Sequence, residues 1–496
     1  MKKYKWIVMI AAIVSGLTSC KKAFLDLSPE NGDLSDNIIF SSKAGAENAL
    51  NGIYWIYRSE NYRGYGGNPG STNLTCRGLQ TIMFFFEVKG NDLFDAYNTW
   101  WRTEGAWEEN GNGRIQTGSR TNQIWDVFYK VINNSNAIIK NVPGITSMGQ
   151  AEKDQFIAEA KANRAYAYFW LARVYQYTYA KNPDAPGVPI YLEPATNASK
   201  GNPRSSLKDV YKLILEDLNA AVSTLSEDRI GVFRINKNVA QGILAEVYQE
   251  LAMSDAALWQ KAIDNAAAAR AAYPLMSNAD YAGGFNDAGN GEWIWGLPVP
   301  EDQTLSYYSQ YSFMDTQGGY YKNIAVNKSF ADLYSATDTR KNLLIPVPAS
   351  SNPALQYQTR KYRTRVQGSI TGDIILMRSA EMLLIEAEGL AQQNKLQEAI
   401  DLLYTLQHLR DPSATKMALA PKDAVINAIL LERRKELYGE LGTYYFDLKR
   451  YQRPLVRDGN HPYPLNIPAD DARWLFQIPL SEIDANPNIN PENQNP

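Results

Sequence analysis

The sequence of residues 425–451 reads VINAILLERRKELYGELGTYYFDLKRY and predicts a long amphipathic helix. Its apolar residues recur at the three- and four-residue spacing of one helical face. Arg433 and Arg434 interrupt that face, and charges so near a core require partners because an unpaired buried charge is costly. We expect those partners one helical turn away, at Glu432, Glu436 and Glu440.

Two glycines predict the end of this helix. Gly439 and Gly442 add backbone freedom that disfavours a continuous helix. The aromatic segment 444–450, YYFDLKR, is then expected to turn back over the helix. We interpret the arginines and glutamates of this stretch as parts of a structural scaffold and not as an active site.

The same stretch resembles a known family. ERRKELYGE at 432–440, followed by FDLKR at 446–450, closely resembles the C-terminal signature of the SusD/RagB family. Members of that family are surface lipoproteins that capture nutrients for an outer-membrane transporter. They usually carry a Gly-His/Gln-Arg-Trp type of sequence between the two motifs, where this chain has LGTYY at 441–445. This departure affects local packing.

The resemblance extends over almost the whole chain. It includes the alanine- and aromatic-rich run FIAEAKANRAYAYFWLARVYQYTY at 156–179, ILMRSAEMLLIEAEGL at 375–390, and the IP…NP pattern of the tail at 476–496. The resemblance implies a glycan-binding lipoprotein that acts as a lid on a SusC-like TonB-dependent transporter. It implies no catalysis.

The composition is ordinary for a globular protein apart from its aromatic residues. The 496 residues are 21% charged and 45% hydrophobic, with a formal net charge of −3. The basic footprint that nucleic-acid binding needs is missing from this sequence. There are 31 Tyr and 11 Trp against two His, and these rings can serve both packing and ligand contact.

The N-terminus predicts export and lipidation. Three lysines among the first five residues precede an apolar run at 6–14 that is too short to span a membrane. LTSC at 17–20 follows directly and resembles a bacterial lipobox. We predict a signal peptide at 1–19, lipidation of Cys20, and a lipid-anchored tether at 20–40, the alternative being a plain secretory signal. Each methylene of the acyl chains that is buried in the membrane would contribute about 0.8 kcal/mol to the free energy of membrane binding.

Cys76 is the one other cysteine. It cannot form an intrachain disulfide once Cys20 is acylated, although export implies an oxidising compartment. We interpret Cys76 as a small buried hydrophobic residue.

Helical periodicity recurs along the chain. The segments 239–253 and 256–273 form one predicted hairpin, and 374–393 and 396–410 form another. Such pairs are typical of tetratricopeptide-like repeats. Residues 79–88 are expected to form a buried helix or strand. Further helices are predicted at 44–58, 121–141, 152–179 and 207–225, with Ser206 as the N-cap of the last.

The resemblance implies the same architecture. We predict a mostly α, SusD-like fold, in which tetratricopeptide-type helix pairs support a large irregular loop-rich region with short strands. Residues 41–496 are assigned to one such domain. The helical scaffold is expected at about 41–58, 119–273 and 374–451, and the loop-rich ligand region at about 59–118 and 274–373.

The two irregular blocks are the candidate site, because long loops inside a compact domain tend to be functional. Within them, 292–297 is predicted to be a short strand whose Trp293 and Trp295 serve packing, and the basic stretch 360–365 a solvated edge. Sugars present apolar faces that stack on aromatic rings and hydroxyls that need polar partners. The candidate ligand contacts are Tyr65, Tyr97, Asn98, Trp100, Trp101, Trp107, Tyr307, Tyr308 and Tyr311, with Arg102, Tyr320 and Tyr321 nearby in the sequence.

Other functions leave weaker signals. We predict no catalytic residue and no cofactor. We also predict no metal site, because the segment 286–292, NDAGNGE, has oxygen ligands but lacks the spacing of a calcium loop. A peptide-binding surface lipoprotein of the same fold is the main alternative. A helical glycoside hydrolase, with Glu104, Glu108 or Glu109 as its carboxylates, and an assembly scaffold without a small-ligand site are more distant ones.

Overall fold

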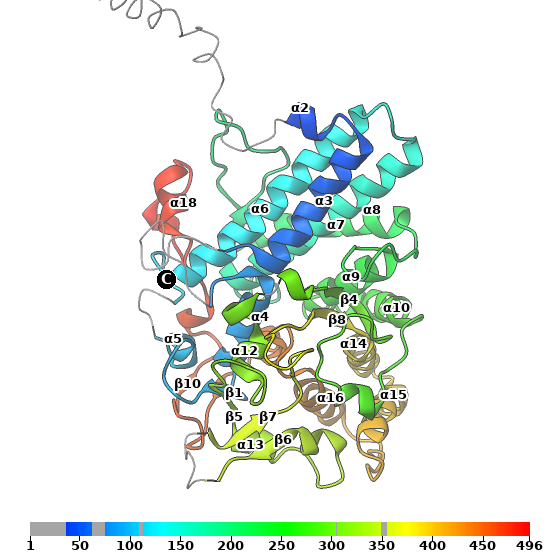
Figure 1. The fold of residues 1–496 in the computed structure, drawn as a ribbon, viewed down its shortest axis with the longest axis vertical. Coiled ribbons are helices and arrows are strands. Elements are labelled where there is room, and N and C mark those ends of the chain that lie inside the picture. Colours follow the sequence, from blue (N-terminus) through cyan, green and yellow to red (C-terminus); the bar gives the residue numbers. More distant parts are fainter. Residues whose placement is uncertain (1–35, 62–74, 109–112, 304, 349–354) are drawn as a thin grey trace, which may run out of the picture.

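The computed structural model describes residues 36–61, 75–108, 113–303, 305–348 and 355–496. Helices dominate, and the described strands are short and belong to small sheets, which confirms the predicted fold class (Figure 1). The predicted signal peptide, Cys20 and most of the tether lie outside the described residues. Within the described ranges, no helix is both long and apolar enough to cross a membrane.

The scaffold is a continuous stack of helices. Each helix packs on the next, and the stack runs from α3 and α6 at the top of Figure 1 to α15 at the lower right. Its members are α3 (Lys43–Ser59), α6 (Ser119–Asn141), α7 (Gln150–Tyr175), α8 (Leu207–Thr224), α9 (Lys237–Leu251), α10 (Trp259–Arg270), α14 (Ser379–Gln392), α15 (Leu396–Arg410) and α16 (Lys422–Leu437).

The predicted helices are confirmed, with one correction at the start of the 374–393 segment. Ile374–Arg378 is a strand, β8, which pairs antiparallel with β4 (Trp293–Leu297). A short, fully buried apolar run fits a strand and a helix equally well, and the neighbouring strand decides between them. Ser206 caps α8 as predicted, because its hydroxyl accepts a hydrogen bond from the Asp209 N–H at 3.1 Å.

One small sheet joins the two loop-rich blocks. It has the order β1-β5-β7-β6, with antiparallel neighbours, so β1 of the first block lies beside β5 of the second. The strands are β1 (Leu93–Asp95), β5 (Ile324–Val326), β7 (Tyr357–Thr359) and β6 (Leu344–Pro346), and two further pairs are β2 (Pro186–Pro189) with β3 (Arg204–Ser206) and β9 (Leu455–Val456) with β10 (Asn466–Ile467).

Short helices complete the loop-rich part and the C-terminal region. The segment 79–88 is the helix α4, whose residues are all buried. The α-helices are α2 (Asp36–Ile39), α4 (Gly78–Lys89), α5 (Arg102–Gly105), α11 (Asn278–Tyr281), α12 (Gln310–Met314), α13 (Lys328–Ala331), α17 (Thr443–Arg450) and α18 (Leu480–Ala485). The 3-10 turns are η3 (Val142–Gly144), η4 (Ala256–Leu258), η5 (Glu301–Gln303), η6 (Ser306–Tyr308), η7 (Thr339–Leu343), η9 (Ala472–Trp474) and η10 (Pro491–Asn493).

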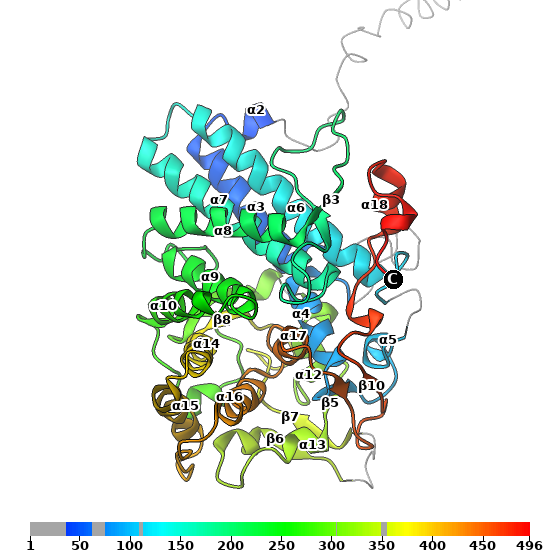
Figure 2. The ribbon, with the colours of Figure 1, turned by 180° about the vertical axis from the view of Figure 1, so that it is seen from behind.

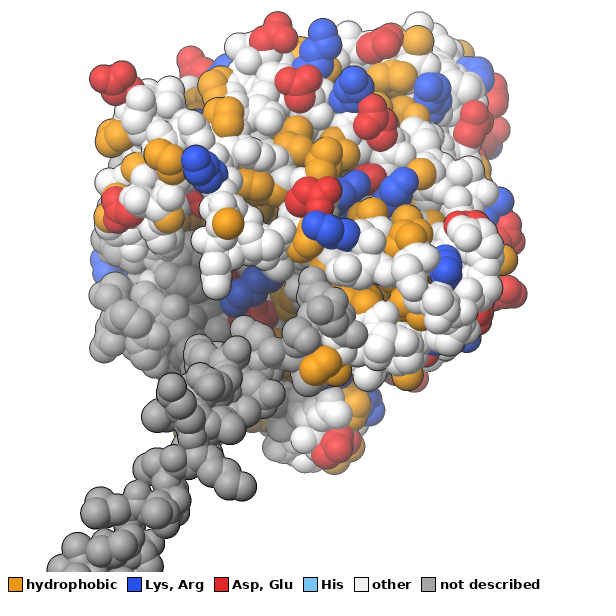
Figure 3. Space-filling model, turned by 90° about the horizontal axis from the view of Figure 1, so that it is seen from above, with side chains coloured by type: hydrophobic (Ala, Val, Ile, Leu, Met, Phe, Trp, Pro, Cys, Tyr) orange, Lys and Arg blue, Asp and Glu red, His pale blue; other side chains and the backbone are white. Residues whose placement is uncertain are grey.

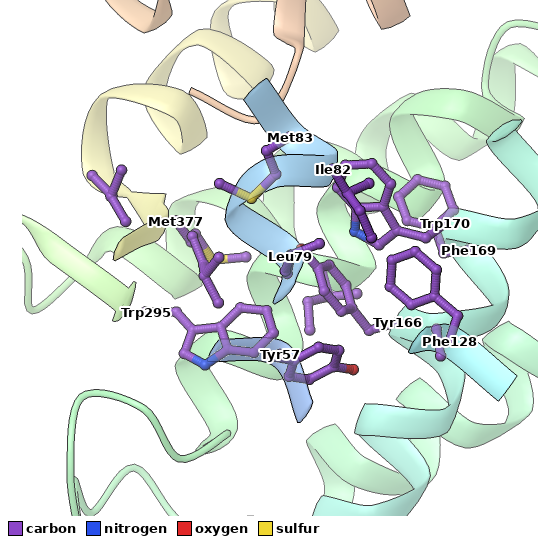
Figure 4. Packing of buried hydrophobic residues seen from close by; sticks show 14 of the residues in the cluster. Tyr57, Leu79, Ile82, Met83, Phe128, Tyr166, Phe169, Trp170, Trp295 and Met377 are labelled. Carbon is purple, nitrogen blue, oxygen red and sulfur yellow. The ribbon is translucent and has the colours of Figure 1, made fainter. Parts of the chain in front are cut away.

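The core joins the scaffold to α4 and to the β4–β8 pair (Figure 4). Trp295 packs edge-on against Tyr166, with ring centroids 4.9 Å apart, and Trp170 stacks on Phe128 at 5.7 Å. Such aromatic pairs add to the stabilisation that burial provides. Trp293 and Trp295 are buried, as is Cys76, which confirms their predicted structural roles.

The ion pairs of α16 differ from those predicted. Arg433 pairs with Asp447 of α17 at 2.9 Å, and Arg434 pairs with Asp92, which precedes β1, at 2.8 Å. Glu432 and Glu436 of α16, and Glu440 just beyond its end, pair instead with Arg340, Arg378 and Lys361 from other segments, and Glu432 also has Lys435 of its own helix at 3.7 Å. Helical spacing identifies residues that could pair, but these side chains point into the protein, where long-range neighbours are closer. Figure 2 shows α16 beside α17, which turns back as predicted.

The most buried ion pairs form one charge network between η7, β8, α15 and α16. The Glu436 carboxylate accepts hydrogen bonds from Arg340 at 2.8 Å, Arg378 at 2.9 Å and Arg410 at 3.0 Å. Burial by itself would raise the pKa of Glu436, but the three guanidinium groups outweigh it and hold that pKa well below its usual range. Such a network fixes the relative positions of the segments that supply its members.

The stretch 360–365 is not the solvated edge that was predicted. Lys361 is fully buried, and its ammonium donates to Glu440 Oε1 at 2.6 Å and to the Tyr438 carbonyl at 2.8 Å. Seen from above (Figure 3), the described surface carries charges of both signs interspersed with hydrophobic side chains. This mixture fits the small net charge of the chain.

Candidate ligand-binding surface

The pairing of β1 with β5 brings the two loop-rich blocks together. Leu93 lies opposite Val326, and Asp95 lies opposite Ile324. The Ala96 N–H continues the ladder by donating to the Asn323 carbonyl at 2.8 Å. The loop that follows β1 and the loop that precedes β5 are therefore side by side, although they are far apart in sequence.

Asp95 shapes the first of these loops. Its buried carboxylate accepts hydrogen bonds from the backbone N–H groups of Tyr97 at 3.0 Å, Thr99 at 2.9 Å and Trp101 at 3.1 Å. A side chain that satisfies several successive N–H groups holds a tight turn without a helix or strand. The turn leaves Trp100 exposed and buries Trp101.

Four rings form an aromatic cluster at the surface, here called the aromatic platform: Trp100 from the first loop, Tyr320 and Tyr321 from the second, and Tyr307 from η6. Ring centroids are 5.7 Å apart for Trp100 and Tyr321, 6.0 Å for Tyr307 and Tyr321, and 4.4 Å for Tyr307 and Tyr320. Trp100 and Tyr307 are each 39% exposed and Tyr320 is 59% exposed. The planes of these neighbouring rings are inclined to one another by 60° to 67°, so the cluster offers apolar ring faces and edges at several angles to a ligand.

Tyr321 attaches the platform to the body of the protein. Its ring stacks on Phe313 of α12, with centroids 5.4 Å apart and planes 13° from parallel. Its N–H donates to the Ser312 carbonyl at 2.8 Å. Phe313 is fully buried, so the Tyr321 ring rests on the core and is held in place before any ligand arrives.

Three of the other predicted site residues are at the surface beside these loops. Tyr97 and Asn98 are exposed, and the Asn98 side-chain oxygen accepts a hydrogen bond from the Tyr463 hydroxyl. Tyr308 is partly buried, with the Arg77 guanidinium 5.0 Å from its ring centroid. Tyr65 lies outside the described residues.

Trp101, Trp107 and Tyr311 are buried, so they present no ring face to solvent. Trp101 packs edge-on between Phe84 at 4.9 Å and Phe313 at 5.3 Å. The Trp107 indole N–H donates to the Lys89 carbonyl at 2.9 Å, and the Tyr311 hydroxyl donates to the Asp373 carbonyl at 2.7 Å. A loop without periodicity does not reveal which of its aromatic residues point inward.

The carboxylates suggested for a hydrolase are engaged elsewhere. Glu104 forms a buried ion pair with Arg120 at 3.0 Å, and burial raises the pKa of Glu104. Glu108 pairs with Arg102 at 2.6 Å. Glu109 lies outside the described residues. Both described carboxylates therefore have partners within the protein.

Two family models match this chain. Residues 75–249 match a SusD-like model described as starch-binding and associating with the outer membrane, and residues 348–496 match the model of the SusD family. A SusD-like protein of Bacteroides ovatus is 29% identical over 252 residues, which cover 49% of this chain and 38% of that protein. SusD-like protein P38 of Formosa agariphila is 24% identical over 99% of both chains.

A solved structure has the same fold along nearly its whole length. The crystal structure of a SusD-like carbohydrate-binding protein from Bacteroides vulgatus is 28% identical, with a TM-score of 0.79 over 91% of this chain and 98% of that chain. The matched family consists of binding proteins and not of enzymes. The matches together with the fold show that this chain belongs to the SusD/RagB family of outer-membrane-associated glycan-binding proteins.

Proposed function

We propose that this protein binds oligosaccharides or polysaccharides at the cell surface through the aromatic platform and delivers them, as a lid, to a SusC-like TonB-dependent transporter. The observation that carries the proposal is the aromatic platform, in which the exposed rings of Trp100, Tyr307 and Tyr320 adjoin the partly buried ring of Tyr321. Pyranose rings expose C–H faces that stack on such rings, while burial of these faces releases water.

The platform is suited to sugars because it is already ordered. Asp95 holds the loop of Trp100, and Phe313 supports Tyr321. Binding to rings held in place costs little conformational entropy. Asn98, two residues before Trp100, is exposed; its side-chain oxygen accepts from Tyr463, so its amide hydrogens are the groups that it can offer to a sugar hydroxyl.

A peptide ligand is the main alternative. Peptide recognition would rely on charged side chains and on backbone groups that extend a strand, whereas the exposed centre of this surface consists of uncharged rings. A hydrolase is less well supported, because Glu104 and Glu108 already pair with Arg120 and Arg102.

Affinity electrophoresis of the purified protein tests the proposal. Native gels would contain amylopectin, xyloglucan, arabinoxylan, galactomannan or pectin, and Trp100→Ala and Tyr307→Ala would run beside the wild type. Trp55→Ala is the matched control, since Trp55 is 50% exposed on α3 and outside the platform. We expect at least one polysaccharide to retard the wild type and the control but not the platform variants. Retardation by none of them, together with binding to peptides, would favour the alternative.

The anchor and the partner need a separate test. We propose that Cys20 is acylated and that the tether of residues 20–40 links it to a domain at 41–496. Cys20→Ala should then remove the protein from the outer-membrane fraction of the native host. A SusC-like transporter should co-purify with the wild type from solubilised outer membranes, and its absence would contradict the proposed lid.

A further inference from the structure

A second hollow lies along α6, on elements that the platform does not use. It is a groove of about 960 Å³ bounded by one face of α6, by the loop 190–202 and by Pro479, Ser481 and Glu482 at the start of α18. In Figure 1 these elements occupy the upper part of the molecule, whereas α5 and α12, which border the platform, lie lower. A groove of this size falls within the range of small-ligand sites.

A row of aromatic rings lines this groove. Trp125 and Tyr129 are one turn apart on α6, with ring centroids separated by 4.6 Å. Tyr191 from the loop 190–202 continues the row, 5.8 Å from Tyr129. The row therefore combines two rings from a scaffold helix with one from a loop. Trp125 is buried, with 7% of its surface exposed, whereas Tyr129 and Tyr191 are partly exposed in the groove.

Hydrogen bonds hold the row in place. The Tyr129 hydroxyl donates to the Pro189 carbonyl at 2.8 Å. The Tyr191 N–H donates to the Tyr168 hydroxyl at 2.7 Å, and the Asn136 amide donates to the Tyr191 carbonyl at 3.0 Å. The loop is thus fixed on α6 and α7, so the groove does not have to form when a ligand binds.

The amide groups of the groove suit a hydroxyl-rich ligand. The Asn134 side chain lines the groove and makes no hydrogen bond to any described residue. The Asn133 side chain uses its oxygen to accept the Ala195 N–H at 2.7 Å, which leaves its amide hydrogens available. Lys130, the cation beside them, is neutralised by Asp126 at 2.9 Å and Glu60 at 2.6 Å. Lys200 and Glu482 also line the groove. The aromatic rings and the unused amides match the apolar faces and hydroxyls of sugars.

We infer that this groove is a second saccharide-binding site, which takes pyranose units of the same glycan class as the platform. The inference rests on the proposed function and deepens it, because a long chain could then be held at two points. Two linked contacts raise the overall affinity for a long glycan well above that of either site alone. A short oligosaccharide that reaches only one site gains nothing from the second.

The test separates the two sites by mutation. The platform is disabled by the double substitution Trp100→Ala/Tyr307→Ala, and the groove is altered by Asn134→Ala or Tyr191→Ala. Asn134→Ala removes an amide that no described residue uses, so the melting temperature of this variant should equal that of the wild type. It therefore tests the groove even if Tyr191→Ala lowers the melting temperature. Affinity electrophoresis would use amylopectin, xyloglucan, arabinoxylan, galactomannan and pectin, with Trp55→Ala as the control.

We expect the platform double variant to retain weak binding that Asn134→Ala abolishes. In the wild-type background, each groove substitution should weaken binding to the long polysaccharide by about tenfold and leave binding of its short oligosaccharides nearly unchanged.

Loss of all binding in the platform double variant would overturn the second site and leave the proposed function intact. Binding of casein peptides that depends on Asn134 would instead overturn the choice of ligand. Failure of the wild type to bind any polysaccharide would overturn both proposals.

Discussion

The indole of Trp100 and the phenol ring of Tyr321 lie 5.7 Å apart, centroid to centroid, although they belong to opposite loop-rich blocks of the chain. The β1–β5 ladder brings their loops together, and the buried carboxylate of Asp95 exposes Trp100. The exposed surface of this protein therefore depends on buried polar contacts beneath it. Substitutions of exposed residues and of the buried residues beneath them should therefore affect glycan binding and folding stability to different extents.

Truncation of the two adjacent tryptophans should lower the stability of the protein to very different extents. Trp101 is fully buried between Phe84 and Phe313, so Trp101→Ala should lower the free energy of unfolding by about 3–5 kcal/mol. Trp100→Ala removes a partly exposed ring and should cost at most about 1 kcal/mol. Urea unfolding followed by circular dichroism measures both values. Equal costs for the two substitutions would contradict the burial described for this loop.

Asp95→Ala tests the turn beneath the platform. The substitution leaves the N–H groups of Tyr97, Thr99 and Trp101 without their acceptor, which should cost about 1–3 kcal/mol of stability. Because the loop then loses its single conformation, glycan binding should weaken by about tenfold or more. Asp484→Ala, at an exposed position of α18, is the control and should change neither value. Unchanged affinity in Asp95→Ala would mean that Trp100 is positioned by other contacts.

Gly442 should not tolerate a side chain. Its φ is +70°, and an added Cβ would lie 2.4 Å from the Cβ of Phe86, a contact that neither backbone nor core can relieve cheaply. Gly442→Ala should therefore lower the melting temperature, with a loss of about 1–3 kcal/mol. Gly459→Ala is the matched control, since an added Cβ there meets no atom within 4 Å. Similar melting temperatures for the two variants would show that the turn between α16 and α17 can adapt.

The sequence was sufficient to predict elements whose pattern is local. The helix stack, the Ser206 cap and the buried Trp293 and Trp295 all follow from periodicity or from a short motif. The partners of Arg433 and Arg434 could not be predicted, because Asp447 and Asp92 reach them only after tertiary packing.

The candidate site was predictable as two loop blocks but not residue by residue. Trp100 and Trp101 are neighbours in a segment without periodicity, and only the contacts of Asp95 decide which ring is exposed. The sequence did not indicate the groove on α6. Trp125 and Tyr129 belong to a predicted helix, where aromatic residues usually indicate packing.

Glu436 should make stability depend on pH. Its folded-state pKa lies well below the unfolded value of about 4.3, so its ionised form stabilises the protein at neutral pH. That stabilisation should be lost as pH falls from about 4 towards the folded pKa. Glu436→Gln should cost about 3–5 kcal/mol at pH 7, because Arg340, Arg378 and Arg410 lose their central anion.

Urea titrations between pH 7 and pH 3 would compare the wild type with Glu436→Gln. The difference in unfolding free energy should narrow as the pH falls. Glu398→Gln, at an exposed position of α15, is the control, and its difference from the wild type should stay near zero throughout. If the difference in unfolding free energy between the wild type and Glu436→Gln stays constant or widens as the pH falls, that result would contradict the depressed pKa of Glu436.

A crystal structure of the protein with an oligosaccharide from the polysaccharide that retards it most would test the platform directly. We predict pyranose rings stacked on Trp100, Tyr307 and Tyr320, with little movement of Tyr321 or of the Asp95 turn. A saccharide bound only at other places, with these rings still in contact with solvent, would contradict the proposal that the aromatic platform is the glycan-binding surface.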